Sequence, residues 1–181
     1  MEWKEQLISL YLYISENKAI KNYLANIRQS NNYSPDFTDE EAMTIYIYGV
    51  HQKRTTVKEI YHYTQQHLKD WFPALPSYQA FDKRLTTIAS AFAVLTNELV
   101  KQGIAGLYFS GESVLDSLPI IVAGNRRSSS ASVAKGFCDK VFCSSKGMYY
   151  YGLKLHLLGF VRPGTIPMPE CFGVTGASEN D

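Results

Sequence analysis

The chain has few cysteines, no long apolar run and almost no net charge, and each shortage excludes a class of protein. Three cysteines are an odd number, which argues against a framework of paired disulfides and fits a reducing compartment. No apolar run approaches the roughly 18 residues that span a bilayer. Residues 1–5 also lack the basic end and apolar middle of a signal peptide. We therefore expect a cytoplasmic protein without a membrane partner.

The composition is that of a folded protein. Hydrophobic residues make up 45% of the 181 positions and charged residues 19%, enough apolar surface for a core and far from the disordered class. Eighteen Lys and Arg against 17 Asp and Glu give a formal net charge of +1. Any nucleic-acid surface must therefore be local. The length fits one ordinary domain or two small ones.

The first hundred residues show the three- and four-residue apolar spacing of amphipathic helices, which predicts about four helices. Two capping boxes predict helix starts at residues 39 and 57, the first in spite of a strand-like alternation over 44–48. A third, longer apolar stripe extends to residue 99 after a capping serine, and a glycine ends it. The residues that mark these ends are Thr38 with Glu41, Thr56 with Glu59, Ser77 and Gly103. Residues 31–36 are turn formers.

The second part of the chain changes to an apolar period of about two, and glycines become frequent. The sequence predicts strands over 113–122, 148–161 and 166–174, with a flexible loop over 124–132. A Pro-Gly turn folds the third strand back against the second. The domain boundary is expected within 103–110. This divides the chain into a helical, candidate DNA-binding region, 1–105, and a sheet region, 106–181.

Positive charge is concentrated in the predicted sheet region. Residues 117–163 carry seven basic side chains against Asp139 alone, whereas residues 1–110 carry eleven of each sign. Because basic side chains bind phosphates by displacing counterions, this segment is a candidate surface for a polyanion. A solvated loop with incidental charge is the competing interpretation. The candidate DNA-binding side chains are Arg126, Arg127, Lys135, Lys146, Lys154 and His156.

Asp116 is the one acid in an otherwise apolar predicted strand. Burying an unpaired carboxylate costs several kcal/mol, so the side chain needs a cation, a set of donors or water. Alternation in 149–157 places Lys154 and His156 on one face and leucines on the other. If the two strands pair, Lys154 and His156 are expected near the carboxylate, below the basic loop. A structural acid and an ordinary half-exposed histidine are the competing interpretations.

The order of these motifs resembles a known family. A helical region is followed by Asp-Ser-x-Pro in a strand, a basic loop, Tyr-Gly-x-Lys-x-His, a Pro-Gly turn, and a strand leading into Thr-Gly-Ala-x-x-x-Asp. In this order and spacing the chain resembles bacterial insertion-sequence transposases of the DDE type. Segments 37–41, 70–77 and 81–85 are similar to the N-terminal part of these proteins. The resemblance implies an α+β fold in which a helical N-terminal region precedes the first strands of a truncated, ribonuclease-H-like mixed sheet.

The same resemblance implies a metal-dependent chemistry. Such transposases use two Asp and one Glu to hold two divalent metals, Mg²⁺ or Mn²⁺, which cleave and join DNA strands. Asp116 matches the first acid and is therefore the candidate catalytic and metal-binding residue. The motifs of the second Asp and the Glu do not occur here, and Asp181 matches a position that is not a metal ligand. One carboxylate does not hold a metal pair, so an inactive N-terminal fragment that binds no metal stably is expected.

The partners that the resemblance implies are double-stranded DNA, both element ends and target, and a second copy in a homo-oligomer. It also implies association with the nucleoid in the cytoplasm. Two other functions remain open. The chain is either a non-catalytic module that binds DNA or a partner and inhibits a full-length transposase, or an inert remnant with an uncovered sheet.

Two further groups of residues are weaker candidates. A zinc site is disfavoured because its cysteine spacing is not that of a zinc knuckle. The helix expected after residue 77 is either a recognition helix that contacts phosphates or a core helix, and core packing is favoured for its apolar positions. The residues concerned are Cys138, Cys143, Cys171 and His156 for zinc, and Lys83 and Arg84 for phosphate.

Overall fold

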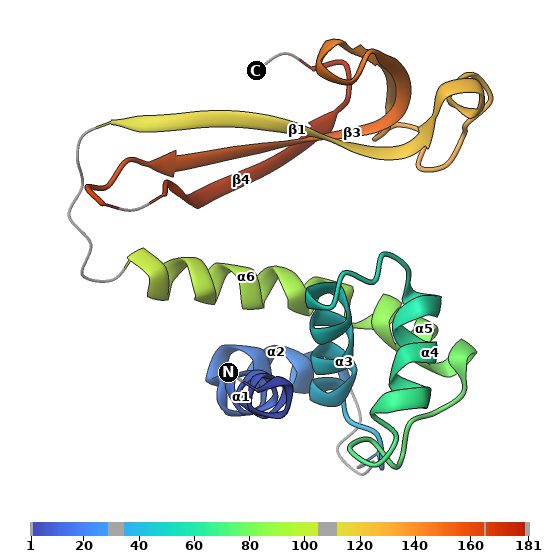
Figure 1. Ribbon diagram of the computed structural model, residues 1–181, viewed down its shortest axis with the longest axis vertical. Helices are drawn as coiled ribbons and strands as arrows, with labels where there is room; N and C mark the ends of the chain where they lie inside the picture. The colour runs from blue at the N-terminus through green and yellow to red at the C-terminus, as the bar shows by residue number, and fades with distance from the viewer. Residues whose placement is uncertain (1, 29–34, 105–111, 165, 180–181) are drawn as a thin grey trace. The chain divides into compact units, whose positions relative to one another are not determined.

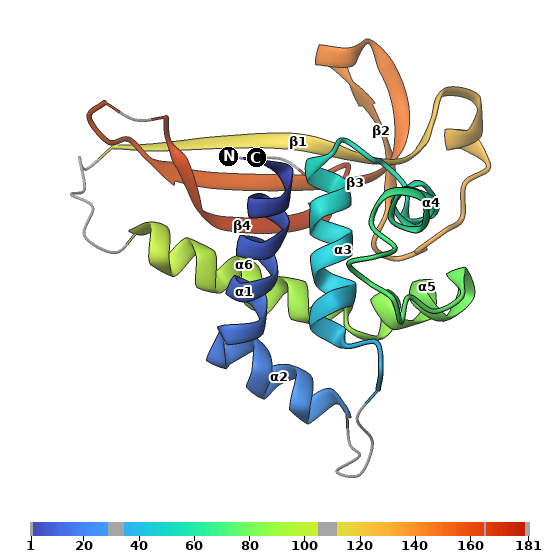
Figure 2. The same cartoon turned by 60° about the horizontal axis from the view of Figure 1, so that its bottom comes forward.

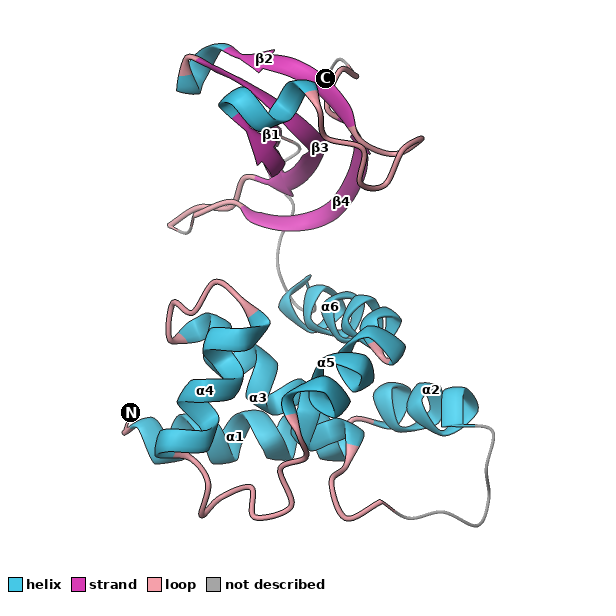
Figure 3. Cartoon of the chain, turned by 90° about the vertical axis from the view of Figure 1, so that its right-hand side faces the viewer, coloured by secondary structure: helices cyan, strands magenta, loops and turns pink. Residues whose placement is uncertain are grey.

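The computed structural model describes residues 2–28, 35–104, 112–164 and 166–179 (Figure 1). The fold is mixed α and β: six α-helices precede an open, four-stranded antiparallel sheet. The chain divides into two compact units, Met1–Leu99 and Val100–Asp181. Helices and strands are segregated between these units (Figure 3). Most of the expected turn at 31–36 and of the boundary at 103–110 lies outside the described residues.

The helical unit begins each of its capped helices where the sequence predicts. Thr38 Oγ1 accepts a hydrogen bond from Glu41 N (3.2 Å), and Glu41 Oε2 accepts one from Thr38 N (2.7 Å). Thr56 and Glu59 form the same reciprocal pair. These bonds satisfy amides that a helix start leaves free, and the strand-like alternation at 44–48 is overruled. The helices are α1 (Trp3–Glu16), α2 (Lys18–Arg28), α3 (Asp39–His51), α4 (Val57–His67), α5 (Tyr78–Thr87) and α6 (Ala89–Ile104).

The prediction of one long helix from residue 78 to Gly103 is wrong. Ile88, with φ −95° and ψ 11°, separates α5 from α6, and Asn17, with ψ 115°, separates α1 from α2. The described chain therefore has six helices rather than four. Thr86 and Thr87 donate their hydroxyls to the carbonyls of Asp82 and Lys83, four residues earlier. Such back-bonding competes with the helix ladder and bends helices. Gly103 lies within α6.

The core of the helical unit is formed by apolar side chains on the inward side of the helices. Figure 2 shows α1 lying alongside α3. A Cβ at Gly49 of α3 would lie 2.6 Å from the side chain of Ile60 on α4, so the close approach of these two helices requires glycine. The largest fully buried apolar side chains of this core are Leu7, Ile14, Ile20, Met43, Ile45, Ile60, Leu68, Phe81 and Ile88.

The sheet is organised around its longest strand. The strands are β1 (Ser113–Gly124), β2 (Asp139–Cys143), β3 (Met148–Phe160) and β4 (Met168–Gly176). β1 pairs with one edge of β3, and β4 and β2 follow one another along the other edge. The three expected strands and the turn between β3 and β4 are confirmed, with ends shifted by up to two residues.

Two features of this unit were not expected. β2 is a strand of five residues, too short to show a clear alternation in the sequence. The expected flexible loop at 124–132 contains a 3₁₀ helix, η1 (Asn125–Ser129), and a second one, η2 (Ser144–Lys146), precedes β3. At the junction of β2 and β4, Ser178 Oγ donates to Asp139 Oδ2 at 2.8 Å. Asp139 therefore joins β2 to the turn that follows β4.

Candidate nucleic-acid interface

The register between β1 and β3 decides which candidate residues meet. Asp116 lies opposite Leu157, whereas Ser117 lies opposite His156 and Pro119 opposite Lys154. Directly opposed residues of an antiparallel pair share one face of the sheet, and neighbours in a strand alternate.

The carboxylate of Asp116 therefore points away from Lys154 and His156. The two strands pair as expected, but the expectation that Lys154 and His156 lie beside the carboxylate is wrong, because they point to the other face of the sheet. A shift of one residue in the pairing of two strands moves a side chain to the other face of the sheet. The pattern of each strand alone does not reveal how β1 and β3 are aligned.

We name the two faces of the sheet by their contents. The leucine face carries Asp116 among apolar side chains, and the histidine face carries polar side chains together with apolar ones. The leucine face includes Val114, Asp116, Leu118, Ile120, Leu153, Leu155, Leu157, Phe172 and Val174, and the histidine face includes Leu115, Ser117, Pro119, Ile121, Tyr150, Lys154, His156, Leu158 and Thr175.

Asp116 is exposed on the leucine face. Its Oδ1 accepts a hydrogen bond of 2.8 Å from the backbone N–H of Ser117, the next residue. Because the side chain is exposed, the cost of burial that would demand a cation does not arise. Its exposed position on β1 would allow Asp116 to supply one carboxylate ligand to a metal ion.

The described residues do not fit the metal pair that the resemblance implies. Over residues 2–28, 35–104, 112–164 and 166–179, no three His, Cys, Asp or Glu side chains come together in a group suited to a metal ion. Mg²⁺ requires near-octahedral oxygen coordination with carboxylate support, and Asp116 alone does not supply it. The three cysteines are free thiols, and no described zinc cluster includes them.

On the histidine face, Lys154 and His156 form hydrogen bonds with β4 and with the turn that follows it. Lys154 Nζ donates to the carbonyl of Glu179 at 2.5 Å. His156 Nε2 lies 2.8 Å from Thr175 Oγ1, and that hydroxyl donates to the carbonyl of Gly176 at 3.1 Å. The threonine oxygen therefore accepts from Nε2. These bonds join β3 to β4 and to the turn after it, and a DNA contact by Lys154 or His156 stays a prediction.

A cavity of about 210 Å³ opens on the histidine face between β1, β3 and η2. Ser117, Tyr150 and Lys154 line it together with Cys143 and Ser145. A hydrogen bond from the Ser145 side chain, with Sγ and Oγ 3.2 Å apart, lowers the pKa of the Cys143 thiol below its ordinary 9.0. Backbone N–H groups of η2 and the Lys146 ammonium act in the same direction. Nothing in the sequence pattern indicated this thiolate environment.

Four of the candidate basic side chains are exposed: Arg126 and Arg127 in η1, Lys135 before β2, and Lys146 in η2. They lie in the connections that lead from β1 to β2 and from β2 to β3. Arg162, which also contributed to the positive charge of this segment, forms an ion pair with Glu170 in which both side chains are 5% exposed. That pair ties the ends of β3 and β4, so Arg162 does not contribute to an exposed basic surface.

An aromatic pair beside a lysine was missed by the sequence reasoning. The rings of Phe142 on β2 and Tyr149 on β3 have centroids 5.0 Å apart, and both side chains are about half exposed, at 49% and 56%. The ammonium of Lys140 lies 5.3 Å from the centre of the Tyr149 ring. Alternation along β3 places Tyr149 on the leucine face. The sequence did not reveal this pair because Phe142 is paired with Tyr149 through β2, and β2 was not predicted as a strand.

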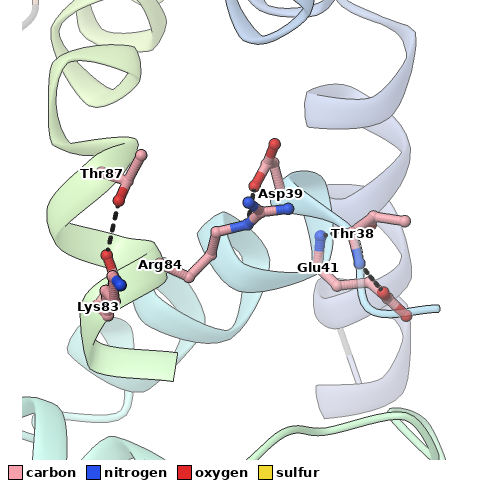
Figure 4. A network of polar contacts seen from close by, with 6 residues as sticks. All are labelled: Thr38, Asp39, Glu41, Lys83, Arg84 and Thr87. Atoms are coloured by element: carbon pink, nitrogen blue, oxygen red, sulfur yellow. Dashed lines mark hydrogen bonds and ion pairs between the residues drawn. The ribbon is translucent and has the colours of Figure 1, made fainter. Parts of the chain in front are cut away.

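In the helical unit, Arg84 has a structural partner. Its Nε lies 2.5 Å from Asp39 Oδ1, and the Asp39 side chain is 4% exposed. Figure 4 shows this pair joining α5 to the first turn of α3. Phe81 and Leu85 of the same helix are buried, which confirms the core-packing interpretation for its apolar positions. Arg84 therefore acts as a packing cation in the helical unit, Lys83 is exposed, and a phosphate contact by either residue stays a prediction.

Comparison with known proteins identifies no relative. No family model, curated protein or solved structure matches the chain significantly. Within the part of the chain that the structure describes, none of the helices has both the length and the apolar content needed to cross a membrane.

Proposed function

We propose that the chain is a DNA-binding protein of the transposase type, whose own part in transposition is to hold element-end DNA. The observation that carries the proposal is the group of four exposed basic side chains in the connections of β1, β2 and β3: Arg126, Arg127, Lys135 and Lys146. No acid other than Asp139 occurs in this stretch, and Asp139 is engaged by Ser178.

The proposed interface combines charge with an aromatic surface. Basic side chains supply phosphate affinity and position the duplex. Exposed aromatic rings stack on unpaired bases at about 1–3 kcal/mol per base, a contribution that applies only where the end of the duplex opens. Phe142, Tyr149 and Lys140 offer such a surface next to η2. We therefore place the DNA along the hairpin of β2 and β3 rather than on the histidine face.

In this proposal Asp116 is the first carboxylate of a cleavage site. It shares the leucine face with Tyr149, eight residues away along β3 by register, which corresponds to about 26 Å and is less than one turn of B-DNA. Because the described residues do not complete a metal pair, we expect DNA binding without cleavage by this chain. The proposal also keeps a ribonuclease-H-like origin for the sheet, supported by the antiparallel order β1, β3, β4 with an acid in β1.

The proposal is tested by fluorescence anisotropy of a labelled 30-base-pair duplex, titrated with the chain over a range of salt concentrations. Replacing the four exposed basic residues with glutamine should weaken binding and reduce the slope of log K against log salt by about 0.9 for each phosphate that the variant no longer neutralises. Asp116→Ala should leave the affinity unchanged. The matched control replaces four exposed lysines of the helical unit: Lys18, Lys21, Lys58 and Lys69.

Two results would reject the proposal. One is an affinity that does not depend on salt. The other is a control variant that binds as weakly as the variant in the sheet unit, because the binding surface would then lie among the helices.

The lone carboxylate favours a second candidate function, that of a non-catalytic module that inhibits an intact transposase. Such a chain occupies element ends without cutting them. The test is excision of a marked element by an intact transposase in cells that express this chain. We expect excision to fall, and to recover when the four basic residues are replaced with glutamine. Unchanged excision at high expression would exclude inhibition.

A further inference from the structure

The outward surface of α1 is apolar. Leu7 and Ile14 are buried in the core of the helical unit, but Ile8, Tyr11 and Leu12 are exposed at 42%, 37% and 45%. A helix on the surface of a globular unit normally presents polar residues there. Clustered apolar residues on an exposed surface mark interaction sites.

A cavity borders this surface. It measures about 300 Å³ and is lined by Ile8, Tyr11 and Leu12 of α1 together with Trp71 and Phe72. Trp71 packs edge to face against Trp3, with ring centroids 6.0 Å apart. Tryptophan and tyrosine are enriched in the energetically dominant parts of protein interfaces.

The charges of α1 indicate which partner fits this surface. Lys4, Ile8, Leu12 and Glu16 follow one another at four-residue steps and are all exposed, so they form one line along the helix. If a second copy of α1 runs antiparallel, about a two-fold axis that crosses this line midway between Ile8 and Leu12, Lys4 faces Glu16 of the second copy and Ile8 faces its Leu12. The line is therefore complementary to itself in both charge and apolar content, as an isologous interface requires.

The helix dipole does not explain where these charges lie, although the Lys4 ammonium also lies 5.7 Å from the centre of the Trp3 ring. Lys4 is in the first turn and Glu16 in the last. The N-terminus of a helix carries a partial positive charge and the C-terminus a partial negative one. Both side chains thus oppose the helix dipole, whereas pairing with a second copy brings each next to an opposite charge.

We propose that α1 is a self-association surface, at which two copies of the chain pair through antiparallel α1 helices. Ile8 and Leu12 of each copy meet at the centre, the cavity beside Trp71 receives apolar side chains of the partner, and the pairs of Lys4 with Glu16 close both ends. This dimer is independent of the proposed DNA binding, because none of its residues lies in the sheet unit.

Charge reversal with rescue tests the proposal. The oligomeric state of the full chain is measured by sedimentation equilibrium from about 1 to 100 μM, the range in which a moderate interface dissociates. Lys4→Glu and Glu16→Lys should each raise the dissociation constant about tenfold, because two symmetry-related pairs become repulsive. The double variant should restore dimerisation. Lys58→Glu, an equal change of charge at an exposed site on α4, should have no effect.

A second variant tests the apolar centre. Ile8→Asp places two carboxylates where the helices meet and should give a monomer, whereas its far-ultraviolet circular dichroism should stay that of the wild type because Ile8 is exposed. A wild-type chain that remains monomeric at 100 μM would overturn the proposal. So would a dimer that persists in Ile8→Asp, or a double variant that fails to recover, since either result would place association at another surface.

Discussion

At the scale of single residues, the ion pair of Asp39 with Arg84 gives a prediction for stability. Asp39 is 4% exposed and its partner 29%. Removing one member of a buried pair leaves a charge without compensation, which costs about 3–5 kcal/mol when burial is complete. The partial exposure of Arg84 reduces this cost.

We predict that Arg84→Ala lowers the free energy of unfolding by about 2 kcal/mol, because Asp39 loses its cation. Urea denaturation followed by far-ultraviolet circular dichroism measures the change. Lys83→Ala, at the exposed neighbouring position, is the matched control and should change stability little. Equal effects of the two variants would show that the pair adds nothing beyond helix propensity.

The Cys143 thiol gives a prediction for pH dependence. Its pKa is lowered, chiefly by the hydrogen bond from Ser145, and the thiolate is the nucleophile. Cys143 should therefore react with iodoacetamide at lower pH than it would without this hydrogen bond. Peptide mass spectrometry follows Cys143 and Cys171 in one reaction.

Ser145→Ala removes the main cause of the lowered pKa, so it should shift the Cys143 reaction profile to higher pH and leave that of Cys171 in place. An identical Cys143 profile in both proteins would mean that the hydrogen bond does not stabilise the thiolate.

At the scale of elements, the backbones of β1 and β3 approach so closely at Gly152 that no larger residue fits there. A Cβ there would overlap the carbonyl of Ile120, next to the bulge between Ile121 and Ala123. By contrast, Gly173 on β4 has nothing within 4 Å of the position where its Cβ would lie.

Gly152→Ala should therefore destabilise the pairing of β1 with β3, by about 1–3 kcal/mol as in other overpacked sites. Hydrogen exchange of peptides from 113–124 and 148–160 should show reduced protection. The matched control, Gly173→Ala, should keep it. Full protection in Gly152→Ala would contradict the register described for these strands.

Local signals in the sequence predicted most of the helices and strands. The elements that were missed left no break or alternation in the apolar pattern. The capping boxes at Thr38 and Thr56 predicted helix starts because their hydrogen bonds lie within four residues. The break at Ile88 was hidden because the apolar stripe continues across it.

The candidate site was predicted less well than the fold. Asp116 and the exposed basic residues were identified from the sequence, but the face on which Asp116 lies depends on the register with β3. The aromatic pair of Phe142 with Tyr149 forms only because β2 pairs with β3. The five residues of β2 are too few to show a strand-like alternation in the sequence. The structural partners of Arg84 and Arg162 are likewise tertiary contacts.

At the scale of the whole molecule, the two units have different proposed tasks. The helical unit has a continuous core and the α1 surface through which we propose that it pairs with a second copy. The sheet unit carries the basic connections, the aromatic pair and a leucine face on which several large apolar side chains are exposed, among them Leu118 and Val174. Binding of DNA by the sheet unit of each copy would let a dimer hold two DNA segments.

The most direct test of the central claim is the affinity of the full chain for the DNA that flanks its own gene. Fluorescence anisotropy at 150 mM salt would compare overlapping 40-base-pair duplexes from both flanks with scrambled duplexes of the same composition. A transposase-type protein should bind one duplex on each side at least about a thousandfold more tightly than the scrambled ones, the lower end of the range for specific sites. Equal affinity for every duplex would contradict the account and leave only a protein with a basic surface and no element-end recognition.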